Sequence, residues 1–221
     1  MNGPMSDDTV VAAVGYDAAP VVALYTRRLQ NFGEGPLAQG WASRASQRRR
    51  FAALAGVGNL RGATVLDVGC GLADLYAYLR EKGALGSPGD YTGVDFAPTM
   101  VRRARARFPE VCFVHCDVAA PVPGPDDEAL PDADYVLASG LFSYLDEGRM
   151  RATVARLYAH CRRGLAFNVL STLAPDKAAV GTLLAADPNE TFRFCRTLTP
   201  WVTLRHDYLP HDFTVYLHRE H

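Results

Sequence analysis

Short apolar runs alternate with helical patterns through the middle of the chain. Strands are predicted at five such runs, residues 65–66, 91–95, 112–115, 133–138 and 164–170. Between them, apolar side chains at helical spacing predict helices over residues 72–81 and 150–161, and a further helix that Pro98 opens and Pro109 closes. Helical segments of about 10 to 15 residues between strands imply a parallel sheet with crossover connections.

The C-terminal part of the chain has a different pattern. Residues 201–208 and 212–218 are two β-rich runs joined by only Leu209, Pro210 and His211. A connection that short forces the two strands to be antiparallel. The chain therefore predicts an α/β fold that ends in a hairpin.

Residues 9–58 precede the sheet. Apolar positions at helical spacing over residues 9–29 predict a helix, residues 31–36 break that pattern, and a basic helix over residues 44–54 leads into the core. Tyr16 and Trp41 have two interpretations. They pack helices onto the sheet, or they stack on an adenosine or an apolar substrate. The sequence alone leaves both open.

Composition and charge exclude several classes of protein. A chain of 221 residues with 48% hydrophobic content can bury one large core. Its net charge of −1 gives no bulk attraction to nucleic acid, and the arginine clusters at residues 48–50 and 102–107 are interpreted as solvated faces. Residues 1–8 do not resemble a signal peptide, and no apolar run approaches the roughly 18 residues of a membrane span. We therefore expect a cytoplasmic protein without membrane contacts.

The five cysteines are odd in number and scattered, which argues against a disulfide framework. Cys112 and Cys116 flank His115, but no second Cys/His pair follows at zinc spacing. Both are therefore predicted to be buried as small apolar residues, and no metal is expected.

The strongest chemical signal follows the first strand. Gly69 and Gly71 form a turn that a Cβ would obstruct, and Asp95 ends the next strand, where it can accept hydrogen bonds from both ribose hydroxyls. Asp67 is predicted to lie at the mouth of this loop. A carboxylate there would repel a pyrophosphate and attract a ligand that carries an ammonium and a sulfonium, such as S-adenosylmethionine (SAM).

This order of residues resembles the class I SAM-dependent methyltransferases, whose loop reads acidic-x-Gly-x-Gly-x-Gly, here with Ala73 in place of the third glycine. The resemblance continues through residues 95–100, 115–118 and 134–139, and covers about residues 60–171. It implies a Rossmann-like, mostly parallel seven-stranded sheet with the last strand reversed and helices on both faces. Residues 1–58 would be an N-terminal helical lid and residues 59–221 the SAM-binding domain of one globular unit.

The resemblance also implies the cofactor contacts. Asp95 would bind the ribose, Met100 and Val118 would flank the adenine, Asp117 would accept from its amino group, and the backbone of residues 69–71 would carry the methionine portion. The full predicted set is Asp67, Gly69, Cys70, Gly71, Asp95, Phe96, Met100, Asp117, Val118 and Ser139. Cys70 is included for its place in the loop, not for thiol chemistry.

The acceptor site is expected between the lid and the carboxyl ends of the later strands, where ligands bind in open α/β sheets. Its candidates are Tyr16, Trp41, Phe142 and Asn168. No catalytic residue is identified, because the cofactor supplies the activation and positioning can suffice. If the acceptor needs deprotonation, His211, His206 and Tyr16 are the candidates, although a structural role is the stronger interpretation of each.

The predicted function is methyl transfer from SAM to a small molecule, with an oxygen, nitrogen or carbon nucleophile and the oligomeric state left open. One alternative is a SAM-binding protein with a regulatory or other role. The other is a nucleic-acid or protein methyltransferase that needs a partner. Residues 138–142 lack the Asn/Asp-Pro-Pro-aromatic motif, which disfavours methylation of nucleobase amino groups, so no nucleic-acid partner is expected.

Overall fold

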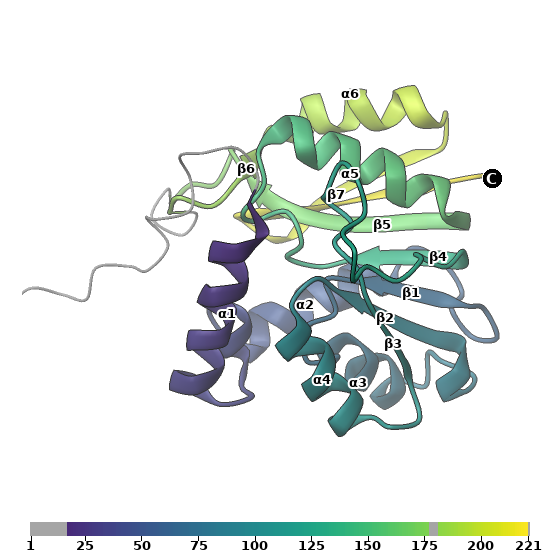
Figure 1. The fold of residues 1–221 in the computed structure, drawn as a ribbon. Coiled ribbons are helices and arrows are strands. Elements are labelled where there is room, and N and C mark those ends of the chain that lie inside the picture. Colours follow the sequence, from purple (N-terminus) through teal and green to yellow (C-terminus); the bar gives the residue numbers. More distant parts are fainter. Residues whose placement is uncertain (1–16, 177–180, 221) are drawn as a thin grey trace, which may run out of the picture.

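The computed structural model describes residues 17–176 and 181–220 as an α/β fold built on one sheet (Figure 1). Its strands are arranged in the order β3 (Cys112–His115), β2 (Tyr91–Asp95), β1 (Val65–Val68), β4 (Ala133–Ala138), β5 (Cys161–Ser171), β8 (Asp212–His218) and β7 (Val202–Leu209). The first five are parallel, and β8 is antiparallel to both β5 and β7. The predicted sheet with a reversed last strand is confirmed, and a two-residue strand, β6 (Ala185–Ala186), also pairs with β5.

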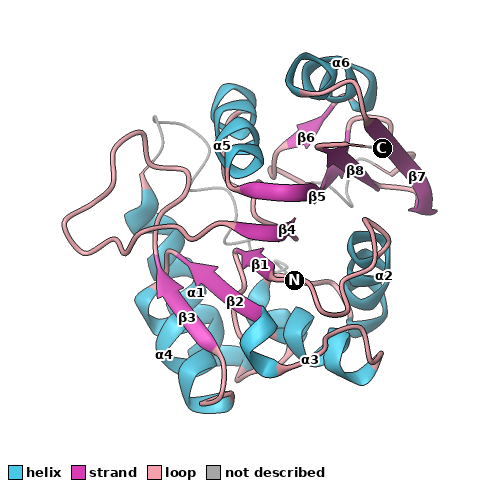
Figure 2. Cartoon of the chain, turned by 90° about the vertical axis from the view of Figure 1, so that its right-hand side faces the viewer, coloured by secondary structure: helices cyan, strands magenta, loops and turns pink. Residues whose placement is uncertain are grey.

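Helices cover both faces of this sheet because successive strand residues point to opposite sides. Leu66 and Val68 face the core beneath α5 (Glu147–Ala159), and Cys195 of α6 (Pro188–Leu198) joins the same core. Val65 faces the opposite core beneath α2 (Arg44–Ala55), α3 (Asp74–Glu81) and α4 (Pro98–Arg107). Figure 2 shows the two helical layers on either side of the strands.

The helix α1 (Ala18–Phe32) does not belong to either layer. It stands at the edge of the sheet where the parallel strands end, next to the short helix η2 (Pro36–Gln39) (Figure 1). Leu29 of α1 and Ala38 of η2 pack with Leu72, Ala97 and Met100 in a small cluster of their own. The N-terminal segment therefore meets the sheet at its carboxyl edge, where ligands bind in such folds.

Several predicted boundaries shift. Helix α3 begins at Asp74, because Ala73 adopts a left-handed conformation that completes the preceding turn. Helix α5 begins at Glu147, since the side chain of Asp146 caps it by accepting from the Arg149 amide. Helix α5 also ends at Ala159, so that β5 starts earlier than predicted.

Helix α6 was not predicted, although its start signal is present. Asp187 accepts hydrogen bonds from the amides of Asn189 and Glu190, and Pro188 occupies the first helical turn. The short 3-10 helix η3 (Pro88–Asp90) is a single turn before β2.

Two predictions about burial are wrong. Cys112 is exposed, because it starts β3 at the edge of the sheet, whereas Cys116 is buried as expected. Arg50 is only 6% exposed, because it lies on the face of α2 that carries Phe51 and Leu54.

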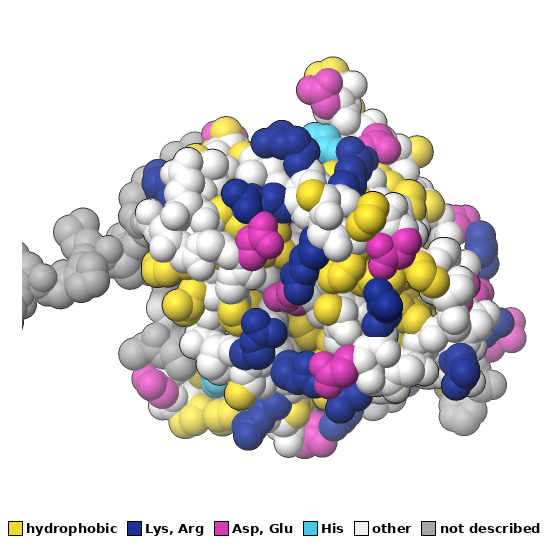
Figure 3. Space-filling model, turned by 90° about the horizontal axis from the view of Figure 1, so that it is seen from below, with side chains coloured by type: hydrophobic (Ala, Val, Ile, Leu, Met, Phe, Trp, Pro, Cys, Tyr) yellow, Lys and Arg dark blue, Asp and Glu magenta, His cyan; other side chains and the backbone are white. Residues whose placement is uncertain are grey.

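Arginines elsewhere on α2 and α4 follow the prediction of a solvated face. On the side seen in Figure 3, basic side chains are interspersed with acidic ones. Arg48 pairs with Glu81, and Arg103 pairs with Glu34. Such pairs are exposed and contribute little to stability.

Candidate active site

The glycine loop after β1 is held against the end of β2. The amides of Gly69 and Cys70 donate to the carbonyl of Val94 at 2.8 and 2.9 Å, and the amide of Gly71 donates to Oδ2 of Asp95 at 2.9 Å. Gly69 and Gly71 have φ values of 76° and 53°, a region that side chains rarely adopt. The loop thus presents bare backbone to the space above it.

Asp95 lies at the floor of that space. Its Oδ1 accepts a second backbone hydrogen bond, from the amide of Ala97 at 2.9 Å, and the residue is 6% exposed. Burial raises the pKa of Asp95 to about 6, and the two backbone donors act in the opposite direction. A carboxylate has about four acceptor positions. Because Asp95 lines the cavity above the loop, it retains capacity to accept from a ligand there.

This cavity, which we call the cofactor cavity, encloses about 1120 Å³ including the part open to solvent. Eight of the ten predicted cofactor-binding residues line it: Gly69, Gly71, Asp95, Phe96, Met100, Asp117, Val118 and Ser139. Met100 comes from α4, and Val118 follows β3, so the adenine positions expected from the sequence face one space. The side chain of Asp117 accepts from the amides of Ala119 and Ala120, which fixes the turn after β3.

Asp67 and Cys70 do not line the cavity. Asp67 shares the sheet face of Val65, so its side chain points away from the cavity and is 2% exposed. It accepts a hydrogen bond from the hydroxyl of Tyr91. Burial raises the pKa of Asp67 to about 7, although this hydrogen bond opposes the shift. Its carboxyl group therefore lies behind the loop and not at its mouth.

The N-terminal segment forms the opposite wall of the cofactor cavity. Sequence reasoning missed most of its members, which are Val21, Tyr25, Arg28, Gln39 and Gly40 beside the predicted Trp41. The rings of Tyr25 and Tyr144 meet edge to face at 6.1 Å and connect α1 with the loop after β4. In the sequence, Tyr25 is only one of the apolar positions at helical spacing.

Gln39 fastens this wall to the glycine loop. Its Oε1 accepts from the amide of Leu72 at 3.1 Å, and its Nε2 donates to Asp74 at 2.7 Å. Gln47 of α2 donates to the same carboxylate at 2.9 Å. A Cβ on Gly71 would lie 2.5 Å from Gln39 Oε1. The glycine at this position therefore leaves room for the Gln39 side chain of the N-terminal wall.

Residues 66–164 match a family model described as a methyltransferase domain. The Mycobacterium tuberculosis protein Rv1506c, whose name assigns it to the methyltransferases, is 36% identical over 160 residues, covering 69% of this chain and 90% of that protein. The chain belongs to the class I SAM-dependent methyltransferases. SAM is the methyl donor of this family and the cofactor of this enzyme.

Further relatives carry different names. Trans-aconitate 2-methyltransferase of Delftia acidovorans is 31% identical over 62% of this chain, and malonyl-[acyl-carrier protein] O-methyltransferase of Pseudescherichia vulneris is 32% identical over 51%. The matches span 48% and 40% of those two proteins.

Solved structures share the fold at low identity. Magnesium protoporphyrin IX methyltransferase of Synechocystis PCC 6803, solved with bound S-adenosylhomocysteine (SAH), has a TM-score of 0.62 at 17% identity over 89% of this chain and 93% of its own. The CcbJ methyltransferase of Streptomyces caelestis has a TM-score of 0.63 at 15% identity over 92% and 99%.

A second cavity of the methyltransferase adjoins the cofactor cavity, and we call it the acceptor cavity. The two share Gly40, Trp41, Gly140, Ser143 and Leu183. Gly140 has φ 72°, and a Cβ there would lie 3.0 Å from the ring of Trp41. The glycine after β4 thus allows Trp41 to stand between the two cavities.

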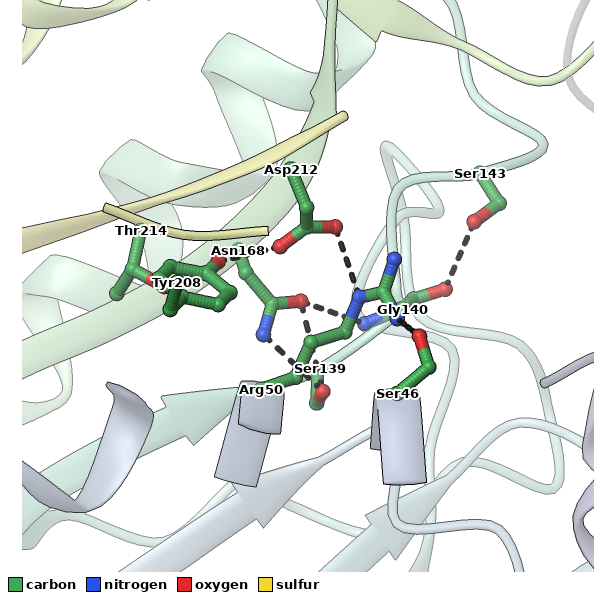
Figure 4. Close-up of polar contacts among 9 residues, drawn as sticks. All are labelled: Ser46, Arg50, Ser139, Gly140, Ser143, Asn168, Tyr208, Asp212 and Thr214. Carbon is green, nitrogen blue, oxygen red and sulfur yellow. Dashed lines mark hydrogen bonds and ion pairs between the residues drawn. The ribbon is translucent and has the colours of Figure 1, made fainter. Parts of the chain in front are cut away.

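Two more residues predicted for the substrate line the acceptor cavity, Phe142 and Asn168. The side chain of Asn168 accepts from the amide of Gly140 at 3.2 Å and donates to the hydroxyl of Ser139 at 3.2 Å (Figure 4). Asn168 on β5 therefore fixes the loop after β4. Ser46, Arg50 and Asp212 also line this cavity and were not predicted.

The three catalytic candidates have different positions. His211 lines the acceptor cavity, where burial and the nearby Arg50 lower its pKa. His206 lies beside the ring of Phe213 and lines neither cavity. Tyr16 is outside the described residues.

The described part of the chain gives no sign of a metal or a membrane span. Within residues 17–176 and 181–220, no three His, Cys, Asp or Glu side chains are grouped in a way that could hold a metal ion. None of the helices described there is both long and apolar enough to cross a bilayer.

Proposed function

We propose that this methyltransferase acts on a small molecule that enters the acceptor cavity and meets the cofactor beside Trp41 and Gly140. The observation that carries the proposal is the junction of the two cavities at these residues. A methyl group presented from the cofactor cavity would reach an acceptor across that junction. A direct junction between two residue-lined cavities suits a small acceptor better than a long polymer.

The fit of SAM rests on the cofactor cavity itself. Asp95 offers charged acceptor positions for the ribose, and Met100 and Val118 offer apolar surfaces for the adenine. The bare backbone at Gly69 and Gly71 allows the methionine portion to approach closely. When bound, SAM supplies an activated methyl group on a sulfonium with a good thioether leaving group.

The protein's own contribution is then positioning. Trp41, Gly140 and the loop held by Asn168 would orient the acceptor, and the wall formed by α1 and η2 would exclude water. Effective positioning can supply roughly 7 to 11 kcal/mol of the barrier reduction without a dedicated base. Where an acceptor must lose a proton, His211 is suited to accept it, since its lowered pKa keeps it neutral at neutral pH.

The acceptor has to be inferred from this chain's cavity. The relatives named above differ in the acceptor that their names state, and each is matched over less than half of its length. The pairing of arginines on α2 and α4 with acidic side chains favours a small molecule over a nucleic acid.

The cofactor assignment is tested with Asp95→Ala. Hydrogen bonds to a charged acceptor contribute about 1.5 to 3 kcal/mol each, so SAH affinity should fall by roughly ten-fold to a few hundred-fold. Titration calorimetry measures it, with the exposed Asp126→Asn as the matched control. Unchanged affinity in a folded Asp95→Ala protein would contradict the assignment. SAH release across a metabolite panel tests the transfer itself, and a protein that binds SAH but never turns over would favour a regulatory role.

A further inference from the structure

The acceptor cavity contains a buried cation with a defined set of partners. The Arg50 side chain is 6% exposed and lines this cavity. Its Nε donates to Oδ2 of Asp212 at 2.8 Å, and its Nη1 donates to the hydroxyl of Ser46 at 2.5 Å. Its Nη2 has no hydrogen-bond partner among the described residues. In Figure 4 this terminal nitrogen has no dashed contact to the other residues drawn.

The Nη2 of Arg50 is not one of the fully buried side-chain atoms that lack a partner, so it remains accessible to a ligand in the cavity. Asp212 also accepts from Tyr208, which in turn bonds Thr214, so the carboxylate that pairs with Arg50 is fixed in position. The guanidinium is thereby held in orientation at Nε and Nη1, and Nη2 remains as its donor for a ligand.

The rest of the acceptor cavity has a polar part, with Ser143, Asn168, His211 and Asp212, and an apolar part. Its walls include the side chains of Trp41, Phe142, Val169, Leu170 and Leu183. The guanidinium carbon of Arg50 lies 5.3 Å from the centre of the Trp41 ring, which places the cation beside the junction with the cofactor cavity. A ligand that combines an apolar body with one group that accepts a hydrogen bond from a cation would match the apolar walls and Arg50.

We propose that Arg50 is a specificity-determining residue that binds a carboxylate of the methyl acceptor in the acceptor cavity. A carboxylate oxygen would accept a charge-assisted hydrogen bond from the Nη2 of Arg50. A single negative charge is favoured over the higher charge of a phosphate, because Asp212 already compensates Arg50 on its other side. This inference rests on the proposed function, which assigns the methyl acceptor to this cavity.

Binding of simple probes tests the assignment without knowledge of the natural acceptor. The sequence contains two tryptophans, so a Trp201→Phe background makes Trp41 the only one and reports on the cavity. Octanoate should change Trp41 fluorescence at concentrations about ten-fold or more below those needed for octanamide. Equal affinities for the acid and the amide would overturn the proposal, and tighter binding of octyl phosphate than of octanoate would overturn the choice of a carboxylate.

Variants at the cation add a second criterion. Arg50→Lys keeps a positive charge but loses the guanidinium. Its affinity for octanoate should fall by about ten- to one hundred-fold, and its affinity for SAH should be retained. Arg49→Lys is the matched control, since Arg49 is the exposed neighbour on the same helix. Asp212→Asn keeps the guanidinium, and octanoate should bind it at least as tightly as it binds the parent. Unchanged octanoate affinity in Arg50→Lys would refute the assignment.

The outcomes for the two proposals are separable. If the parent protein does not bind SAH, the proposed function is refuted. The octanoate measurement is made without SAH, so its result on Arg50 would still hold. Retained SAH binding with no preference for octanoate over octanamide would remove only the role of Arg50. If Arg50→Lys does not fold, the comparison of acid and amide on the parent still decides the proposal.

Discussion

Replacement of Asp67 by asparagine is expected to stabilise the fold at neutral and alkaline pH. Asp67 is 2% exposed, and burial raises its pKa from 3.8 to about 7. Because the pKa is raised, the folded protein binds this proton more tightly than the unfolded chain does. The stability that goes with it is present in full below pH 3.8 and is lost as the pH rises to about 7.

The size of the loss follows from the shift. About three pKa units at 1.36 kcal/mol each correspond to about 4 kcal/mol above pH 7. An asparagine has no charge to desolvate and can still accept from the hydroxyl of Tyr91, but burying its amide has a cost of its own. We therefore expect a gain of about 2 to 4 kcal/mol at pH 8, or roughly 4 to 16 °C in Tm for a chain of this size.

Thermal unfolding at pH 4.5 and pH 8 measures this effect by circular dichroism. Asp67→Asn should raise Tm mainly at pH 8, and the exposed Asp126→Asn should change Tm little at either pH. A Tm for Asp67→Asn that is unchanged or lower at pH 8 would refute the reasoning. SAH titration of the same variant tests function, since loss of a negative charge behind the glycine loop should weaken binding of a ligand that carries an ammonium.

Two further substitutions test the walls of the cofactor cavity. Gly71→Ala should weaken SAH binding at least about ten-fold, because alanine at φ 53° is strained by about 1 to 2 kcal/mol and its Cβ would collide with Gln39. Calorimetry in a Gln39→Ala background should recover the part due to the collision. Trp41→Ala should lower kcat/KM more than SAH affinity, since Trp41 lines both cavities. Equal losses in the two would contradict a role at the acceptor.

The parallel strands and the cofactor cavity could be predicted because their signals are local. Residues that end or directly follow a parallel strand lie at the carboxyl edge of the sheet. The order of residues along the chain is therefore enough to predict the positions of Gly69, Asp95 and Asp117. The prediction that Asp67 lies at the mouth of the loop is wrong. Side chains alternate between the two faces of a strand, so Asp67, two positions after buried Val65, shares its face. A strict application of strand alternation would have put this carboxylate behind the loop.

The burial of Arg50 has a signal in the sequence, in the spacing of its neighbours on one helix face. Gln47, Arg50, Phe51 and Leu54 are all buried, at the spacing of one helix face. The run of three arginines suggested a solvated surface instead. The ion-pair partner of Arg50 cannot be predicted from a local pattern. Asp212 lies 162 residues away along the chain, and the fold of the final hairpin brings it to Arg50.

The charged groups around the two cavities differ in kind, and this bears on how the ligands would be oriented. Asp67 and Asp95 lie under the cofactor cavity, whereas the acceptor cavity on the other side of Trp41 is lined by Arg50 and its ion-pair partner Asp212. The carboxyl groups favour a cationic sulfonium on the first side, and the Nη2 of Arg50 would donate to an anionic group on the second. An anionic group turned toward the cofactor cavity would instead meet Asp95, and repulsion in a site of low polarity is stronger than in water. The arrangement therefore selects for orientation as well as for affinity.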